Sequence, residues 1–236
     1  MAASEVHNLY RVSAATRFRR WALRTIFRPI FRSLCDIHII GKENIPKHGA
    51  YIIAHNHISL FEPPLILAFW PIPPEAVSGA DVFSRPGQQI MVIAYGGIPL
   101  HRGRYDRKVI DVMMSLLEQG MPLLISPEGG RSHEIGLRRA LPGVAYLMDQ
   151  ANVPVLPVGI VGTTDDMLER AFRLERPRLE IHIGNPFVLP PITGKGEARR
   201  RSRQKNADMV MQHIAALLPD IYHGVYKHPD SLSPTI

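Results

Sequence analysis

Apolar residues recur along the chain with two spacings, and each spacing predicts one kind of secondary structure. Short alternating or continuous runs of β-branched and other apolar residues predict strands, whereas apolar positions three or four residues apart predict helices. The predicted strands cover residues 34–40, 50–54, 75–79, 96–101, 121–126, 153–161 and 179–183. The predicted helices run from 59 or 61 to 70, and then over 84–94, 106–119, 141–150 and 195–218.

Strands and helices therefore alternate through most of the chain, which indicates an α/β fold with a mixed, mostly parallel β-sheet flanked by helices. No internal repeat, low-complexity tract or evident domain linker interrupts this pattern. We expect residues 34–236 to form a single domain and residues 1–33 to form an N-terminal amphipathic helical segment. In sheets of this type, functional side chains gather in the loops that follow the strands.

The N-terminal segment carries the basic charge of the chain. Residues 11–32 hold seven arginines and no acidic residue, while the whole sequence has 28 Lys and Arg against 21 Asp and Glu. On a helical wheel, five arginines share one side and four large apolar residues share another: Arg17, Arg20, Arg24, Arg28 and Arg32; Leu23, Ile26, Phe27 and Ile30. Pro29 should kink or split this helix.

A basic amphipathic helix of this kind favours a membrane interface, with its arginines on anionic phospholipid headgroups. The alternative is a terminal helix that packs on the body of the protein and keeps a solvated charged face. A nucleic-acid-binding domain would more often spread its basic residues over the body of the fold. We therefore expect no nucleic acid partner.

Composition limits the compartment and the class of protein. Cys35 is the only cysteine among 236 residues, so the chain has no internal disulfide and no cysteine-rich zinc site, which fits a reducing compartment. We find no secretory signal and no run of about 18 apolar residues that would span a bilayer. These features predict a peripheral protein on the cytoplasmic side of the cell membrane.

The first candidate for chemistry is the polar stretch of residues 54–64, which lies between a predicted strand and a predicted helix. A histidine before a helix and a carboxylate in its first turn can form a hydrogen bond, so Glu62 would orient His57 as a general base. No serine stands in a nucleophile elbow, so a substrate hydroxyl would supply the nucleophile. Two alternatives are a zinc site that uses His55 with His57 and Glu62, and a purely structural polar turn.

Two further loops follow predicted strands and carry arginines. Residues 101–108 hold four cations, among them Arg102, and Asp106 is a natural N-cap for the next helix. Residues 126–132 combine Gly129 and Gly130 with a carboxylate and Arg131. Convergent arginines suit a phosphate, and glycines let the backbone approach a ligand. Taken singly, each loop is also compatible with a solvated loop or an ordinary turn.

The ordered set of motifs resembles that of the glycerolipid acyltransferase family, and its 1-acylglycerol-3-phosphate acyltransferases look most similar. The motifs are Asn56-His57-x-Ser59-x-x-Glu62, then residues 97–102 (GIPLHR), 127–132 (PEGGRS) and 153–158 (VPVLPV). The resemblance implies that His57 is the general base and that Glu62 orients it. It also implies that Arg102 and Arg131 bind the acceptor phosphate, and that Glu128 and Gly129 shape the acceptor site. Residues 153–158 would bind the acyl chain or belong to the core.

The chain departs from the family pattern at three positions. The family usually has aspartate at Glu62, an aromatic residue at Ser126 and threonine at Gly130. Glutamate is one methylene longer than aspartate and can still orient an imidazole, so we expect activity with altered geometry.

The resemblance implies an O-acyltransferase that moves a fatty acyl group from acyl-CoA or acyl-carrier protein to lysophosphatidic acid in phospholipid synthesis. An acyl thioester is already activated, so we expect no metal and no organic cofactor. The expected partners are a membrane surface, the acyl donor and a lysophospholipid acceptor. Other acceptors, namely glycerol phosphate, another lysolipid or a glycolipid, stay open, as do a metal-dependent hydrolase and a non-catalytic lipid-binding protein.

Overall fold

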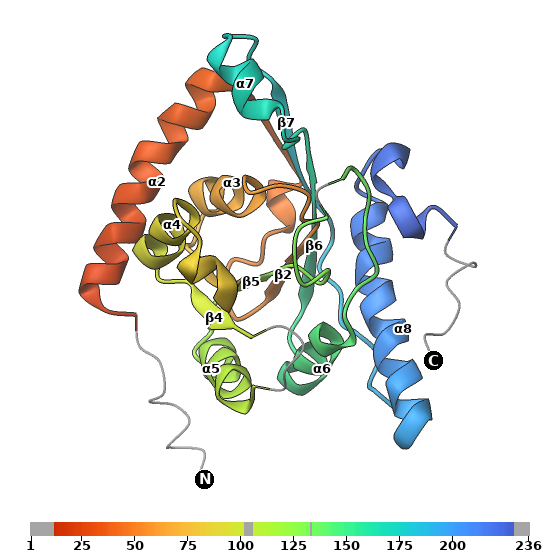
Figure 1. Ribbon diagram of the computed structural model, residues 1–236. Coiled ribbons are helices and arrows are strands. Elements are labelled where there is room, and N and C mark those ends of the chain that lie inside the picture. The colour runs from red at the N-terminus through yellow and green to blue at the C-terminus, as the bar shows by residue number, and fades with distance from the viewer. Residues whose placement is uncertain (1–11, 102–105, 133, 229–236) are drawn as a thin grey trace.

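The computed structural model describes residues 12–101, 106–132 and 134–228 (Figure 1). Its α-helices are α2 (Ala14–Leu34), α3 (Glu62–Phe69), α4 (Gln88–Tyr95), α5 (Arg107–Glu118), α6 (Pro142–Ala151), α7 (Met167–Phe172) and α8 (Gly196–Ala215). Its strands are β1 (Asp36–Ile40), β2 (Ile52–His55), β3 (Glu75–Gly79), β4 (Ile98–Leu100), β5 (Leu123–Ile125), β6 (Val155–Val161) and β7 (Arg178–Ile183). Four 3₁₀ turns complete the described elements: η1 (Lys42–Asn44), η2 (Ala80–Ser84), η3 (Asp220–Tyr222) and η4 (Gly224–Tyr226).

The described strands form one sheet in the order β1-β7-β6-β2-β5-β3-β4. Strands β6, β2, β5, β3 and β4 are mutually parallel, and β7 pairs antiparallel to β6. Strand β1 in turn runs parallel to β7. The prediction of a single α/β fold with a mixed, mostly parallel sheet is therefore confirmed.

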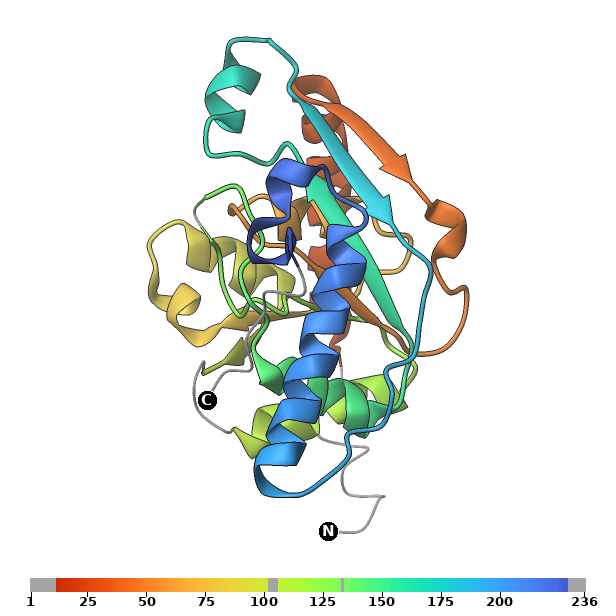
Figure 2. The same cartoon turned by 90° about the vertical axis from the view of Figure 1, so that its right-hand side faces the viewer.

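Helices cover both faces of this sheet (Figures 1 and 2). On one face α5, α6 and α8 bury side chains such as Leu116, Leu147 and Met211 against the strands. On the other face α2, α3 and α7 bury Phe31, Ile66 and Met167 in a second cluster. The central strands are buried on both sides, which explains why 50–54 and 153–161 read as nearly continuous apolar runs.

Most predicted elements agree with the structure to within a few residues. Asp106 caps α5, as predicted, by accepting a hydrogen bond from the backbone N–H of Val109 at 3.2 Å. The helix predicted over 84–94 begins only at Gln88, because η2 and the Pro86-Gly87 pair precede it. Helix α7 was not predicted, because six residues are too few for a helical spacing of apolar positions to be visible.

The N-terminal helix corrects two predictions. Pro29 does not split the helix, because α2 runs without a break from Ala14 to Leu34. The arginine side faces outward only in part, since Arg17 and Arg32 are exposed. Arg20 is buried against Glu75, and the guanidinium groups of Arg24 and Arg28 donate to carbonyls at the C-terminal end of α3. These partners are favourable because cations stabilise the negative end of a helix dipole.

Large apolar side chains of α2 are exposed instead. They are Phe18, Trp21, Ile26 and Ile30, whereas Leu23 and Phe27 turn toward a cavity in the body of the protein. Within the parts of the chain that the structure describes, no helix combines the length and hydrophobicity needed to cross a bilayer. The exposed positions of α2 therefore combine these large apolar side chains with Arg17, Arg19 and Arg32.

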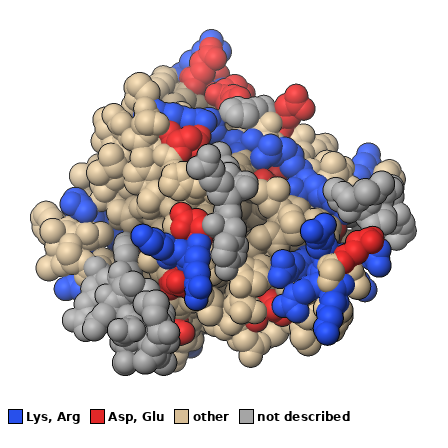
Figure 3. Space-filling model, turned by 60° about the horizontal axis from the view of Figure 1, so that its bottom comes forward, with Lys and Arg blue, Asp and Glu red and all other residues tan. Residues whose placement is uncertain are grey.

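The basic residues of the body are spread over several groups. Figure 3 shows Lys and Arg side chains on one face, with acidic side chains among them. One group, at the right of this view, lies over the start of α8, where Arg199, Arg200, Arg201 and Lys205 follow one another closely in the sequence. Glu197 pairs with Arg201 in this group.

Candidate functional site

The candidate site lies where three neighbouring strands end. Ala54 of β2 pairs with Ile125 at the end of β5, and His55 pairs with Val158 of β6. Since these strands are parallel, the loops that follow them leave the sheet at the same edge. The side-chain amide of Asn56 extends the ladder, because it donates to Ile160 O at 3.0 Å and accepts from Ile160 N at 2.7 Å.

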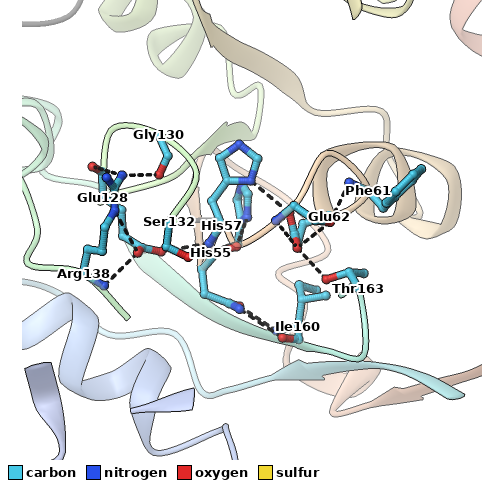
Figure 4. Close-up of polar contacts among 12 residues, drawn as sticks. His55, His57, Phe61, Glu62, Glu128, Gly130, Ser132, Arg138, Ile160 and Thr163 are labelled. Atoms are coloured by element: carbon cyan, nitrogen blue, oxygen red, sulfur yellow. Dashed lines mark hydrogen bonds and ion pairs between the residues drawn. The ribbon is translucent and has the colours of Figure 1, made fainter. Parts of the chain in front are cut away.

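The structure brings His57 and Glu62 together. Nδ1 of His57 lies 2.9 Å from Oε2 of Glu62, which is the first residue of α3 (Figure 4). Ser59 closes the short loop between them, since its backbone N–H donates to Glu62 Oε1 at 3.0 Å. A carboxylate only accepts hydrogen bonds, so Nδ1 carries the proton and Nε2 is the nitrogen left to act as a base.

The Glu62 carboxylate is completely buried and accepts several hydrogen bonds. Burial alone would raise its pKa, but the hydrogen bond and charge of His57 and the hydroxyl of Thr163 outweigh burial, so the pKa is lowered. Thr163 follows β6 and donates its hydroxyl to Glu62 Oε1 at 2.5 Å. The carboxylate is therefore held in its charged form next to the imidazole.

Glu128 supports His57 from the opposite side. Its Oε1 accepts from the backbone N–H of His57 at 2.8 Å, and its Oε2 accepts from the backbone N–H of Arg138 at 2.9 Å (Figure 4). The N–H of Ser132 donates to His57 O at 2.9 Å. Burial raises the pKa of Glu128 to about 7. This residue thus fixes the backbone of His57 to the loop of residues 126–132.

Gly129 and the arginines occupy the same loop region. Gly129 has φ +71°, and a Cβ there would lie 2.3 Å from the side chain of Leu141, so only glycine fits without rearrangement. Arg131 lines the cavity next to His57. Arg138 donates to Gly130 O at 2.6 Å and so holds the loop from outside. The predicted phosphate ligand Arg102 lies outside the described residues.

His55 is a buried residue at the end of β2, whereas His57 is the histidine that contacts Glu62. Burial, followed by the nearby charge of His57, lowers the pKa of His55 to about 4. Its Nδ1 lies 2.7 Å from Asn56 O, to which it donates. Within the described ranges, no group of three or more His, Cys, Asp and Glu side chains is placed to hold a metal ion. His55, His57 and Glu62 therefore do not form the three-ligand group that the alternative of a zinc site requires.

A large cavity opens in front of His57. It has a volume of about 960 Å³, and its wall includes His57, Glu128 and Arg131 at one part and mostly apolar side chains elsewhere. The apolar wall comes from α2, α3, α4 and α7, with residues such as Phe27, Leu67 and Met91. Cavities of this size and lining suit an apolar ligand with a few polar groups.

The motif at residues 153–158 lies away from this cavity. It forms the start of β6, where Val155, Leu156 and Val158 are completely buried in the two core clusters. Of its two interpretations, acyl-chain binding or core, the structure supports the core. The apolar lining of the cavity comes instead from α2, α3, α4 and α7, and most of these apolar residues belong to none of the four sequence motifs.

Two polar contributors were missed by the sequence analysis. Thr163 stands just beyond β6, and Arg138 stands between the glycine-rich loop and α6. The position of Thr163 after a strand was a usable signal, because β2 and β6 were both predicted as buried strands. Arg138 gave no such signal, since it lies in a stretch that resembles an ordinary connection.

The fold and site together define an α/β protein with a histidine–carboxylate pair at the wall of an apolar cavity. The Acyltransferase family matches residues 36–161, which is more than half of the chain and includes His57, Glu62, Glu128 and Arg131. The chain therefore belongs to the Acyltransferase family.

Two relatives resemble the chain in sequence or in structure. The 1-acyl-sn-glycerol-3-phosphate acyltransferase of Borreliella burgdorferi is 25% identical over an alignment of 158 residues, and this alignment covers 64% of our chain. The chain covers 61% of that protein's length. The crystal structure of PlsC, the 1-acyl-sn-glycerophosphate (LPA) acyltransferase of Thermotoga maritima, has a TM-score of 0.61 at 23% identity. This match covers 86% of our chain and 80% of the crystallised one, and it shows a shared fold.

Proposed function

We propose that this protein transfers a fatty acyl group from acyl-CoA or acyl-carrier protein to the free hydroxyl of lysophosphatidic acid. The observation that carries the proposal is the position of the His57–Glu62 pair at the wall of a large apolar cavity that Arg131 also lines. Membership of the Acyltransferase family supports the reaction class, and the names of both relatives support the choice of acceptor. The product would be the diacylated precursor of phospholipids.

In the proposed reaction, His57 Nε2 removes the proton of the acceptor hydroxyl while the hydroxyl oxygen forms a bond to the thioester carbonyl carbon. Collapse of the tetrahedral intermediate breaks the carbon–sulfur bond, and the departing thiol takes the proton from His57. Glu62 keeps the ring oriented and stabilises the imidazolium that forms between these steps. General-base assistance of this kind is worth roughly 10²–10⁴-fold in rate. The scheme needs neither a metal nor an organic cofactor.

Arg131 and Arg102 are the proposed ligands of the acceptor phosphate. Arg131 lines the same cavity as His57 and Glu128, which supports its assignment as a phosphate ligand. The Arg131→Ala variant should raise KM for a phosphate-bearing acceptor and leave KM for the acyl donor unchanged. The exposed Arg107, which begins α5, provides the matched control. Equal KM values for Arg131→Ala and the wild type would contradict the assignment.

We further propose that the protein binds the cytoplasmic surface of the cell membrane as a peripheral protein. The exposed apolar side chains of α2, Trp21 among them, would enter the lipid interface, so insertion rather than an arginine stripe makes the main contact. A Phe18→Ser and Trp21→Ser double variant should lose flotation with liposomes. These substitutions leave the buried contacts of Arg20 and Phe31 in place, so unchanged flotation would refute the contact.

The deciding experiment offers the purified full chain a labelled acyl-CoA or acyl-carrier protein together with a panel of glycerol phosphates, lysolipids and glycolipids. Mass spectrometry identifies the labelled products. The proposal predicts that lysophosphatidic acid is the preferred acceptor and that phosphatidic acid forms. Preference for another compound of the panel would show that the proposed acceptor is wrong. Absence of acyl transfer to every compound would refute the proposed reaction.

A further inference from the structure

The turn that follows α7 exposes two large apolar side chains. Phe172 is 73% exposed and Leu174 is 77% exposed, and no large apolar residue in the described chain is more exposed. Leu168, one turn before Phe172, is also exposed. Exposed apolar patches of this kind mark surfaces that another phase or molecule covers.

The backbone of this turn gives no structural reason for the leucine. The N–H of Glu175 donates to Arg170 O at 3.1 Å and the N–H of Leu174 donates to Ala171 O at 3.0 Å, which is the Schellman pattern of a helix end. Leu174 therefore stands at the left-handed position, with φ +61°, where glycine is the usual residue.

The apolar contact that often accompanies this pattern is also missing. The position of that contact is taken by an ion pair, because Arg170 Nε lies 3.1 Å from Glu175 Oε2. Leu174 is thus both conformationally unfavourable and unburied in the isolated protein.

This turn lies against the C-terminal end of α2. Arg176 donates from Nη2 to Arg32 O at 3.1 Å, and Figure 1 shows α7 beside the upper end of α2. Ile26 and Ile30, which are exposed, lie in the C-terminal half of α2. The exposed apolar side chains at the end of α7 therefore belong to a segment that contacts the C-terminal end of α2, although the two elements are far apart in the sequence.

The same two elements also contribute to the wall of the cavity in front of His57. Its wall includes Ile30 and Leu34 of α2 together with Met167, Leu168 and Ala171 of α7. Ile30 and Leu168 belong to this wall and are also exposed to solvent. A lipid that enters here would pass from the surface directly into the apolar part of the cavity.

We propose that the cavity opens between α2 and α7, and that Phe172 and Leu174 insert into a lipid bilayer and hold this opening against the membrane. This inference rests on the proposed lipid acyltransferase function and adds a second membrane-contacting element to α2. The acceptor then enters the cavity from the bilayer without crossing water.

The charges around the turn favour a hydrophobic contact over an electrostatic one. Arg173 pairs with Glu169, and Arg170 pairs with Glu175 and, more distantly, with Asp166. These pairs leave little net charge on α7 for anionic headgroups to attract. The contribution of Phe172 and Leu174 to lipid binding should therefore persist at high salt.

The test compares vesicle binding of the full chain with that of a Phe172→Ser and Leu174→Gly double variant. Leu174→Gly suits the left-handed backbone, and Phe172 is exposed, so the variant should fold normally. Val188, an exposed residue that follows Phe187 near the start of β6 at the opposite end of the strand from α7, supplies the control Val188→Ser. Vesicles contain phosphatidylglycerol and phosphatidylcholine, and binding is measured by flotation at low and high salt.

The double variant should bind vesicles at least tenfold more weakly at both salt concentrations, and Val188→Ser should bind like the wild type. Binding of the double variant equal to that of the wild type would overturn the proposal. So would a lipid-free wild-type dimer that the double variant abolishes, because a second copy would then be the occupant of this face.

Activity assays separate this inference from the proposed function. With a short-chain, fully soluble lysophosphatidic acid, the double variant should match the wild type, whereas with the acceptor embedded in vesicles it should be at least tenfold slower. Equal loss with both acceptors would overturn the membrane role. Absence of acyl transfer by the wild type would refute the proposed function. The vesicle-binding comparison would still test the membrane contact of Phe172 and Leu174, because it does not depend on activity.

Discussion

The hydroxyl of Thr163 donates a hydrogen bond to Oε1 of Glu62 at 2.5 Å, although the two residues are 101 positions apart in the sequence. The contact joins the loop after β6 to the first residue of α3. Glu62 in turn holds His57, so Thr163 acts on the proposed base through a buried carboxylate. We regard Thr163 as a positioning residue.

Replacing Thr163 by valine should lower kcat about tenfold, because a hydrogen bond to a charged group contributes about 1.5–3 kcal/mol and about 1.4 kcal/mol corresponds to tenfold in rate. KM for both substrates should stay the same. Steady-state kinetics measure both constants, and Thr163→Ser, which keeps the hydroxyl, should restore most of kcat. A valine variant with the kcat of the wild type would show that the contact does not position Glu62.

Glu62 itself offers a graded test of the orienting role. In Glu62→Gln the charge is lost, so kcat should fall by roughly 10²–10⁴-fold. In Glu62→Asp the charge is kept but the chain is one methylene shorter, so the loss should be smaller. Single-turnover kinetics with labelled donor compare the two variants. Equal kcat for glutamine and glutamate at this position would remove Glu62 from the mechanism.

The sequence predicted the fold and the central pair because both depend on local patterns. Parallel strands bury both faces and therefore leave apolar runs, and His57 and Glu62 are only five residues apart, across a strand–helix boundary. Thr163 and Arg138 reach the site through strand order and loop geometry, which a single sequence does not encode locally. The same limit applies to the cavity, whose wall combines four helices.

The orientation of α2 could not be predicted from its amphipathic pattern. A helical wheel separates arginines from apolar residues but does not say which side packs on the body. The buried partners decide this, because Glu75 at the start of β3 and the free carbonyls at the end of α3 receive the arginines. Polar partners from distant elements thus turn Arg20, Arg24 and Arg28 toward the body of the protein.

Glu128 should make stability depend on pH. Burial raises its pKa to about 7, so the folded state favours the protonated carboxyl. Its stabilising contribution is complete below the ordinary glutamate pKa and is lost as pH rises through about 7. A shift of this size corresponds to a loss on the order of 3 kcal/mol.

The comparison with Glu128→Gln isolates this effect from other titrating groups, including His55. The wild type minus variant difference in free energy of unfolding, measured by urea denaturation, should fall between pH 4.5 and pH 8. A difference that is constant over this range, or that rises with pH, would mean that Glu128 is ionised throughout.

The buried pair of Arg20 and Glu75 should hold α2 on the body. Arg20 Nη2 lies 2.8 Å from Glu75 Oε2, and both side chains are almost fully buried. Arg20→Met leaves an unpaired buried carboxylate, so the free energy of unfolding should fall by about 3–5 kcal/mol. The exposed Arg17→Ala should change it by less than about 0.5 kcal/mol. Similar urea midpoints for the two variants would contradict this role.

His57 is the proposed base of the acyl transfer, and an assay of product formation tests this role. Purified wild type and His57→Ala receive a labelled acyl thioester and lysophosphatidic acid, and the labelled phosphatidic acid is quantified. His38→Ala, which changes an exposed histidine on β1, is the control, and circular dichroism verifies that each variant is folded. We predict at least a hundredfold loss of product formation for His57→Ala and none for His38→Ala. A folded His57→Ala protein that transfers the acyl group at the wild-type rate would contradict the account.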